Sequence, residues 1–200
     1  MLLKRGFDIT VSLIGLLILL PVLLFISILI KAVMPGPILF KQIRVGKNGK
    51  LFTMYKFRTM IINHSGSSVS VKGESRITPL GSILRKLKLD ELPELWNILI
   101  GDMSFIGPRP DVPGYADRLN KDDQIILSVR PGLTGLATLK YITEEEILAQ
   151  QKNPQHYNDN VIYPDKVRIN KRYINEWSFW LDMQIFFWTI TGSKLPDKYR

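Results

Sequence analysis

The stretch from residue 9 to residue 30, ITVSLIGLLILLPVLLFISILI, decides the architecture of this chain, because it holds 22 residues and no charge. A helix of about 20 apolar residues crosses the hydrocarbon core of a bilayer. The apolar part of a signal peptide has only about 7 to 15 residues and ends in a small-x-small cleavage site. The sequence KAVMPGP that follows here lacks such a site. The stretch therefore predicts a membrane segment.

Pro21, near the middle of the stretch, decides how that segment meets the membrane. A proline inside a helix removes one hydrogen bond and clashes with the preceding turn. Lys4 and Arg5 precede the stretch and seven Lys or Arg residues follow it by residue 58, so both flanks favour the cytoplasmic side. We therefore predict a re-entrant helical hairpin broken at Pro21 over residues 1–36. A kinked single span is the alternative.

The composition limits the partners of the chain. Its 27 basic and 18 acidic residues give a net charge of +9, which calls for anionic lipid, a phosphorylated substrate or nucleic acid. Beside a membrane segment the first two are favoured, and no RNP-like or helix-turn-helix pattern supports nucleic acid. The absence of cysteine excludes disulfides and a thiol nucleophile, and two histidines, His64 and His156, leave little for a histidine-rich metal site.

Residues 37–200 are predicted to form a cytoplasmic catalytic domain. Pro37–Val45 and Leu51–Arg58 are rich in aromatic and branched residues, and the Gly46-Lys47-Asn48-Gly49 sequence between them predicts a β-hairpin. Lys56 and Arg58 are expected to share one face of it. Residues 62–77 are rich in Ser and Gly and predict a mobile loop.

The sequence WSFWLDMQIFFWTI, residues 177–190, holds six aromatic residues and is too short to span a bilayer. It predicts a helix lying in the headgroup boundary, with a core helix as the alternative. The expected fold class is therefore α+β and membrane-associated. An N-terminal re-entrant helical hairpin would precede a mostly helical cytoplasmic domain with a small β-hairpin and amphipathic interfacial helices.

Two short helices are expected to meet at Leu89-Asp90, because apolar residues recur at helical spacing on both sides of it. Asp90 suits the N-cap of the second helix, with Glu91 in its first turn and Pro93 where a missing N–H is harmless. A helix N-terminus stabilises negative charge, so both carboxylates are expected to remain ionised. A plain capping role is the alternative interpretation.

Arginines accompany this acidic pair. Arg85 lies shortly before it, the prolines of Gly107-Pro108-Arg109-Pro110 fix a stiff anion clamp, and Arg130 in VRPGLTG offers a second corner. Carboxylates combined with arginines suggest phosphoryl chemistry, in which cations bind the phosphate and a carboxylate attacks it or holds Mg²⁺. A rigid surface turn is the alternative for the proline-flanked arginine.

The motifs follow one another in the order KRGFD, apolar segment, PGPILFKQIRVG, YKFRTM, LRKLKLDELPELWNIL, GDMSFIGPRP and VRPGLTG. Over nearly the whole chain this order resembles the bacterial sugar transferase family, the small monotopic polyprenol-phosphate sugar-1-phosphate transferases. The resemblance implies an enzyme on the cytoplasmic face of the bacterial inner membrane. It would transfer a sugar-1-phosphate from a UDP-sugar to undecaprenyl phosphate and release UMP, as the first membrane step of surface glycan or glycoprotein oligosaccharide synthesis.

The resemblance also implies roles for single residues. Asp90 would attack the β-phosphate of the UDP-sugar and form a phosphosugar-aspartyl intermediate, which undecaprenyl phosphate then attacks. Glu91 would complete the dyad, and both carboxylates would hold Mg²⁺. The family's re-entrant helix breaks at a Ser-Pro pair, where this chain has Leu20-Pro21. The groups expected to bind substrate phosphate are Arg85, Arg109, Arg130, Lys56 and Arg58.

Two other functions stay open at this point. A membrane-anchored basic module could bind anionic lipid or nucleic acid, and a phosphohydrolase could use Asp90 as its phosphoryl acceptor. The expected partners are a UDP-sugar, undecaprenyl phosphate, the bilayer and downstream glycosyltransferases of the same pathway, without nucleic acid. A homodimer is compatible with a membrane-surface enzyme, but no pattern predicts one. Residues 141–157, YITEEEILAQQKNPQHY, are expected to help select the sugar.

Overall fold

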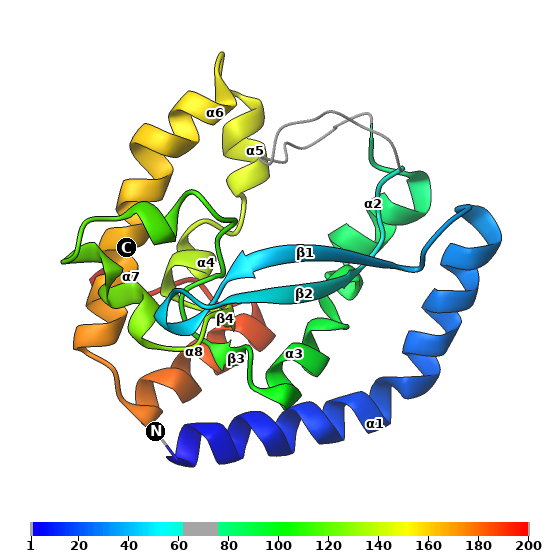
Figure 1. The fold of residues 1–200 in the computed structure, drawn as a ribbon, viewed down its shortest axis with the longest axis horizontal. Helices are drawn as coiled ribbons and strands as arrows, with labels where there is room; N and C mark the ends of the chain where they lie inside the picture. Colours follow the sequence, from blue (N-terminus) through cyan, green and yellow to red (C-terminus); the bar gives the residue numbers. More distant parts are fainter. Residues whose placement is uncertain (1, 62–75, 200) are drawn as a thin grey trace.

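The computed structural model describes residues 2–61 and 76–199 and shows a helix-rich fold with two small sheets (Figure 1). This confirms the mixed helix and strand composition expected from the sequence. The predicted loop over residues 62–77 lies outside the described residues except for its last two positions. The elements are α1 (Leu2–Val33), β1 (Leu39–Val45), β2 (Leu51–Phe57), α2 (Pro79–Lys86), α3 (Glu94–Ile100), β3 (Ser104–Ile106), β4 (Gly132–Thr134), α4 (Leu136–Lys140), α5 (Glu144–Ala149), α6 (Pro154–Tyr157), α7 (Tyr163–Asn175) and α8 (Phe179–Thr191).

Helix α1 is the one helix in the described part of the chain that is long and apolar enough to cross a membrane. It has 32 residues, and only 11% of its most apolar 18-residue stretch is buried. The helix is continuous through Pro21 and bends near its middle, so that its second half turns upward along the side of the domain (Figure 1). Two separate helical arms are therefore not observed. Re-entry into a bilayer stays a prediction.

The first turns of α1 are bound to the domain by their charged residues. Lys4 Nζ lies 2.7 Å from Asp182 Oδ2 in α8 and 2.8 Å from Ile106 O in β3. Asp182 is 1% exposed and also accepts hydrogen bonds from Tyr173 Oη at 2.6 Å and Trp177 Nε1 at 3.0 Å. These contacts join α1 to α7 and α8. The ammonium group of Lys4 is thus paired with a buried carboxylate of the protein itself.

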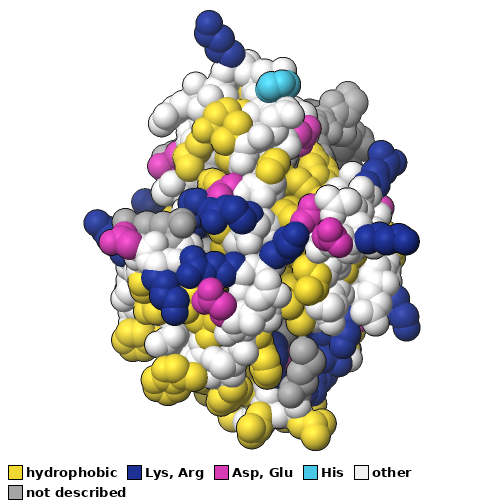
Figure 2. Space-filling view, turned by 90° about the vertical axis from the view of Figure 1, so that its left-hand side faces the viewer, with side chains coloured by type: hydrophobic (Ala, Val, Ile, Leu, Met, Phe, Trp, Pro, Cys, Tyr) yellow, Lys and Arg dark blue, Asp and Glu magenta, His cyan; other side chains and the backbone are white. Residues whose placement is uncertain are grey.

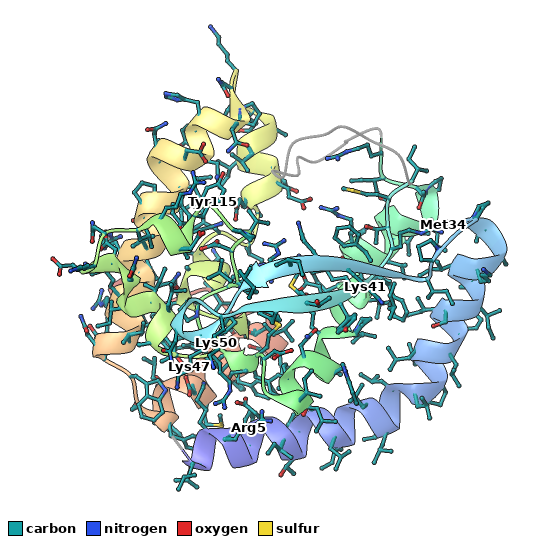
Figure 3. The ribbon with its side chains drawn as sticks, viewed as in Figure 1. Arg5, Met34, Lys41, Lys47, Lys50 and Tyr115 are labelled. Carbon is teal, nitrogen blue, oxygen red and sulfur yellow. The ribbon has the colours of Figure 1, made fainter. Side chains whose placement is uncertain are left out.

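Arg5 and Asp8 complete this attachment. Arg5 donates hydrogen bonds of 2.7 and 2.8 Å to the carbonyl oxygens of residues 98 and 99, where a cation stabilises the C-terminal end of α3 (Figure 3). Asp8 is buried and accepts from Ser104 Oγ at 3.0 Å and Phe105 N at 3.1 Å. The sequence KRGFD therefore fixes the helix against the strand that leads to the GPRP motif.

The second half of α1 packs on the other side of the domain. Ile26, Ile30 and Met34 form a buried cluster with Phe57 of β2 and Leu84 of α2. A separate and larger cluster lies between α3, β3, α7 and α8, and the first half of α1 packs against it. The apolar helix thus has one face on the domain. Its other face exposes large side chains: Leu13, Ile14, Leu17, Ile18, Leu20, Leu24, Phe25 and Ile28.

Strands β1 and β2 form the predicted antiparallel hairpin. Leu39 pairs with Phe57 at one end and Val45 pairs with Leu51 at the other. Asn48 and Gly49 have φ values of 56° and 74°, which Asn and Gly adopt at little cost. Figure 3 shows the tip of the hairpin, marked by its two labelled lysines, at the end opposite Met34.

Asn97 of α3 binds the outer edge of β2. This side chain is fully buried, accepts a hydrogen bond from Tyr55 N at 3.1 Å and donates one to Thr53 O at 2.7 Å. It pairs with the strand much as a neighbouring strand would. Helix α3 is thereby held beside β2.

Glycines bring the GPRP and RPGLTG motifs into backbone contact. Strands β3 and β4 are parallel, and the chain continues with hydrogen bonds from Gly107 N to Thr134 O at 2.9 Å and from Gly132 N to Pro108 O at 2.8 Å. A Cβ atom on Gly132 would lie 2.1 Å from Gly107 N. Only glycine fits there, so this contact fixes the backbone that carries Arg109.

Helix α8 has both a buried and an exposed side. Ser178 caps it by accepting from Leu181 N at 3.1 Å, and Leu181 and Ile185 are buried. Trp180 and Phe187 are 71% and 61% exposed. In Figure 2, apolar side chains gather along the lower edge of the visible face, with Lys, Arg, Asp and Glu above them. The position of α8 in a headgroup layer stays a prediction.

Candidate active site

Asp90 lies in a turn between α2 and α3 and caps neither of them. Lys88 adopts a left-handed conformation with φ 57°, which ends α2, and residues 89–91 form a single 3₁₀ turn. Helix α3 begins only at Glu94, after Pro93. The predicted N-cap role of Asp90 is therefore wrong, because Pro93 takes the flanking position and leaves Asp90 about one turn upstream.

The Asp90 carboxylate is buried and incompletely paired. Asp90 is 8% exposed, and its Oδ1 has no hydrogen-bond partner among the described residues. Burial and then the neighbouring Glu91 charge raise the pKa of Asp90. The helix N-terminus expected to stabilise its charge begins only at Glu94, and the ionisation of Asp90 stays a prediction. A buried oxygen without a donor is free to contact a substrate or a metal ion.

Glu91 is held by two cations from different parts of the chain. Lys56 Nζ of β2 lies 2.8 Å from Glu91 Oε1, and Arg109 of the GPRP motif forms an ion pair with the same oxygen. Burial raises the pKa of Glu91, but the Arg109 and Lys56 charges outweigh it and hold the pKa well below its usual range. Glu91 thus stays ionised. Its charge in turn raises the pKa of Arg109.

Glu94 and Arg44 join the site without having been singled out in the sequence. Glu94 is 1% exposed, its Oε1 lies 3.1 Å from Lys56 Nζ, and burial raises its pKa. Arg44 donates to Pro110 O at 2.9 Å, and burial, then the Arg109 charge, lowers its pKa to about 10. The spacing of three residues between the two glutamates was the signal that could have revealed Glu94.

Arg85 approaches the site from the last turn of α2. It forms an ion pair with Glu145 of α5, and its charge acts to lower the pKa of Asp90. The structure therefore brings together five of the residues expected to act in the site: Asp90, Glu91, Lys56, Arg85 and Arg109.

The other two predicted phosphate-binding residues lie elsewhere. Arg58 is 5% exposed and donates to Pro35 O at 2.8 Å and Met34 O at 2.5 Å, beyond the end of α1. Arg130 donates from Nε to Gly101 O at 2.7 Å, at the end of α3 opposite to Asp90. Both guanidinium groups bind backbone carbonyls in this structure. An arginine in the sequence does not indicate whether its guanidinium group will bind a backbone carbonyl or a phosphate.

The site offers two carboxylates for a metal ion. No cluster of three or more His, Cys, Asp or Glu side chains that could hold a metal occurs within residues 2–61 and 76–199. Mg²⁺, however, is commonly held by one or two carboxylates together with substrate phosphates. The unpaired Oδ1 of Asp90, beside Glu91, fits that mode. A groove of about 560 Å³ lies along α7, and it contains none of these residues.

Comparison with known proteins gives consistent matches over this chain. The family described as Bacterial sugar transferase matches residues 1–193. An exopolysaccharide production protein, PSS, of Rhizobium leguminosarum bv. phaseoli is 38% identical over 98% of this chain and 97% of its own length. Two longer relatives are matched over only part of their length.

One of these is a UDP-N-acetylgalactosamine-undecaprenyl-phosphate N-acetylgalactosaminephosphotransferase of Aeromonas hydrophila, 36% identical over 94% of this chain and 42% of its own. The other is a UDP-glucose:undecaprenyl-phosphate glucose-1-phosphate transferase of Klebsiella pneumoniae, 34% identical over 95% of this chain and 40% of its own. The family match covers almost every element described above, including the acidic dyad and its cations. The chain therefore belongs to the bacterial sugar transferase family and is a transferase enzyme.

Proposed function

We propose that this protein transfers a sugar-1-phosphate from a UDP-sugar to undecaprenyl phosphate and releases UMP. The observation that carries the proposal is the buried Asp90 oxygen without a partner, beside a glutamate that two cations hold ionised. The names of the Aeromonas and Klebsiella relatives support the two substrates. The match to the Rhizobium exopolysaccharide protein supports a role in making a surface glycan.

The reaction proceeds in two displacements at the same phosphorus. An Asp90 oxygen attacks the β-phosphorus of the UDP-sugar, the bond from that phosphorus to the bridging oxygen breaks, and UMP leaves with that oxygen. The sugar phosphate is then attached to Asp90 as an acyl phosphate. A phosphate oxygen of undecaprenyl phosphate attacks next and restores the carboxylate. A covalent carboxylate lets one site handle two phosphate substrates in turn, so we expect ping-pong kinetics.

The cations around Asp90 support this chemistry. Lys56 and Arg109 hold Glu91 in place, and Arg85 approaches from α2, so positive charge surrounds the position of the transferred phosphate. Mg²⁺, when bound by Asp90 and Glu91, would neutralise charge on the diphosphate. Burial raises the pKa of Asp90, whereas the Lys56 and Arg85 charges act to lower it, so these cations favour the ionised form that attacks phosphorus.

The exposed side of α1 suits a bilayer, where a lipid phosphate and a soluble nucleotide sugar have to meet. We place the helix in the cytoplasmic membrane, re-entering on the cytoplasmic side, because basic residues flank both of its ends. The exposed aromatic side chains of α8 would lie at headgroup depth. The product would serve downstream glycosyltransferases of the same glycan pathway.

The test uses purified protein in nanodiscs with undecaprenyl phosphate, Mg²⁺ and a panel of UDP-sugars. UMP release is measured for the native chain, for Asp90→Asn, and for Asp122→Asn, an exposed position that makes the same change in charge. We expect one donor to give UMP with the native chain and the control only. Donor labelled at the β-phosphate, without undecaprenyl phosphate, should leave label on native protein and none on Asp90→Asn.

Four results would contradict the proposal in different ways. Activity retained by Asp90→Asn would exclude it as the nucleophile. UMP release that requires undecaprenyl phosphate, with no trapped label, would indicate a single displacement. Turnover with water alone would indicate a phosphohydrolase. Salt-sensitive lipid binding without any turnover would indicate a basic binding module.

A further inference from the structure

Helix α5 brings a carboxylate to the site from outside the acidic dyad. Its Glu145 forms an ion pair with Arg85 of α2, across 60 positions of the chain. Both helices lie above the hairpin in Figure 1. Arg85 is the arginine whose charge also acts on Asp90. Glu145 therefore pairs with a guanidinium group whose charge also acts on Asp90.

A second ion pair holds α5 in place. Glu144, the neighbour of Glu145, pairs with Lys166 of α7. Because Glu144 and Glu145 bind different helices, α5 connects α7 to α2. Release of Arg85 would leave α5 attached to α7. The Arg85 contact can thus break without unfolding the helix.

The two partners differ in how firmly they are held. The Arg85 side chain is 21% exposed, whereas the Glu145 side chain is 45% exposed. Ion pairs with this much exposure contribute little to stability, on the order of a few-fold in an equilibrium constant. By contrast, Glu91 is shared between Lys56 and Arg109 and its side chain is 15% exposed. Glu145 is therefore the carboxylate that an incoming anion can displace most readily among these pairs.

We propose that Glu145 occupies the place on Arg85 that a substrate phosphate takes, so that substrate binding exchanges a carboxylate for a phosphate. The inference rests on the proposed function, since a phosphate attacked by Asp90 has to lie near the cations whose charges act on Asp90. A phosphate offers a guanidinium group two parallel charge-assisted hydrogen bonds. It therefore competes well against one half-exposed carboxylate. In the absence of substrate, Glu145 keeps Arg85 paired and positioned.

The experiment measures binding of inorganic pyrophosphate, a diphosphate without base or sugar. Isothermal titration calorimetry is performed on the full chain in phosphatidylcholine nanodiscs at low, fixed salt. Glu145→Gln is compared with native protein and with Glu176→Gln. The control removes the same charge from a glutamate that also pairs with an arginine and whose side chain is 38% exposed.

We expect Glu145→Gln to bind pyrophosphate about threefold more tightly, the loss of one exposed competing ion pair, and Glu176→Gln to bind as native protein does. In an Arg85→Gln background, the Glu145→Gln change should have no further effect. Weaker or unchanged binding by Glu145→Gln would overturn the inference, as would equal tightening in the control.

The outcomes also separate this inference from the proposed function. Failure of native protein and of Glu145→Gln to bind pyrophosphate would overturn both the inference and the phosphate site on which the function depends. Tighter binding by Glu145→Gln, together with no UMP release from any UDP-sugar, would support the exchange at Arg85 and count against the proposed reaction alone.

Discussion

Replacing Lys4 by methionine tests how strongly α1 is bound to the domain. The substitution keeps a long side chain but removes the cation that pairs with Asp182 at 2.7 Å. Asp182 is 1% exposed, and its remaining donors, Tyr173 Oη and Trp177 Nε1, are neutral. Removing one partner of a buried ion pair costs about 3 to 5 kcal/mol. Since two hydrogen bonds remain, we expect about 3 kcal/mol.

Thermal unfolding in nanodiscs measures this loss. For a chain of this size, 1 kcal/mol corresponds to about 2 to 4 °C in Tm, so Lys4→Met is expected to unfold about 6 to 12 °C lower. Lys31→Met is the matched control, because Lys31 lies on the same helix and is exposed. Adding Asp182→Asn to Lys4→Met should recover part of the loss. A shift of less than about 2 °C in Lys4→Met would refute this account of the attachment.

Burial raises the pKa of Asp111 from 3.8 to about 6. The folded state therefore binds a proton more tightly than the unfolded state, and the free energy of unfolding falls as pH rises from about 4 to 6. Asp111→Asn should abolish that fall and be about 2 to 3 kcal/mol more stable than the native chain at pH 7.5. A parallel slope in the variant's pH-dependent Tm would contradict this. Gly132→Ala is expected to cost about 3 kcal/mol or more, because its Cβ would meet Gly107 N at 2.1 Å; a native Tm would show that the contact relaxes. Asn97→Ala leaves Tyr55 N and Thr53 O without their partner and should cost about 2 to 4 kcal/mol, with faster hydrogen exchange at the Tyr55 amide. Unchanged protection there would show that another group replaces the amide.

Features set by neighbouring residues could be predicted from the sequence. The hairpin follows from Asn48 and Gly49, whose positive φ values suit those residue types. The short helices around the dyad follow from apolar spacing. The cap was misplaced because two local signals competed: Asp90 favours an N-cap, but Pro93 delays the start of α3 to Glu94. This shift of a few residues places Asp90 outside the first turn of α3.

Features that depend on distant residues could not be read from local patterns. Nothing near Asn97 indicates that its amide binds the edge of β2, some 40 positions earlier. Arg58 and Arg109 are both arginines in conspicuous motifs, yet one binds the carbonyls after α1 and the other binds Glu91. Their partners are fixed by tertiary structure alone. The family resemblance indicated which motifs form one site, and the structure added Glu94, Arg44 and Glu145 to it.

The attachment of α1 has a consequence for the order of events during synthesis. The helix leaves the ribosome before the residues that bind it, because the partner of Asp8 is made 96 positions after it and that of Lys4 178 positions after it. An apolar segment of this length is more stable in a bilayer than in water. We therefore expect the nascent helix to enter the bilayer while its acidic and basic side chains are still hydrated at the surface. The contact between Lys4 and Asp182 can form only after α8 has emerged, so we expect membrane insertion of α1 to precede folding of the domain.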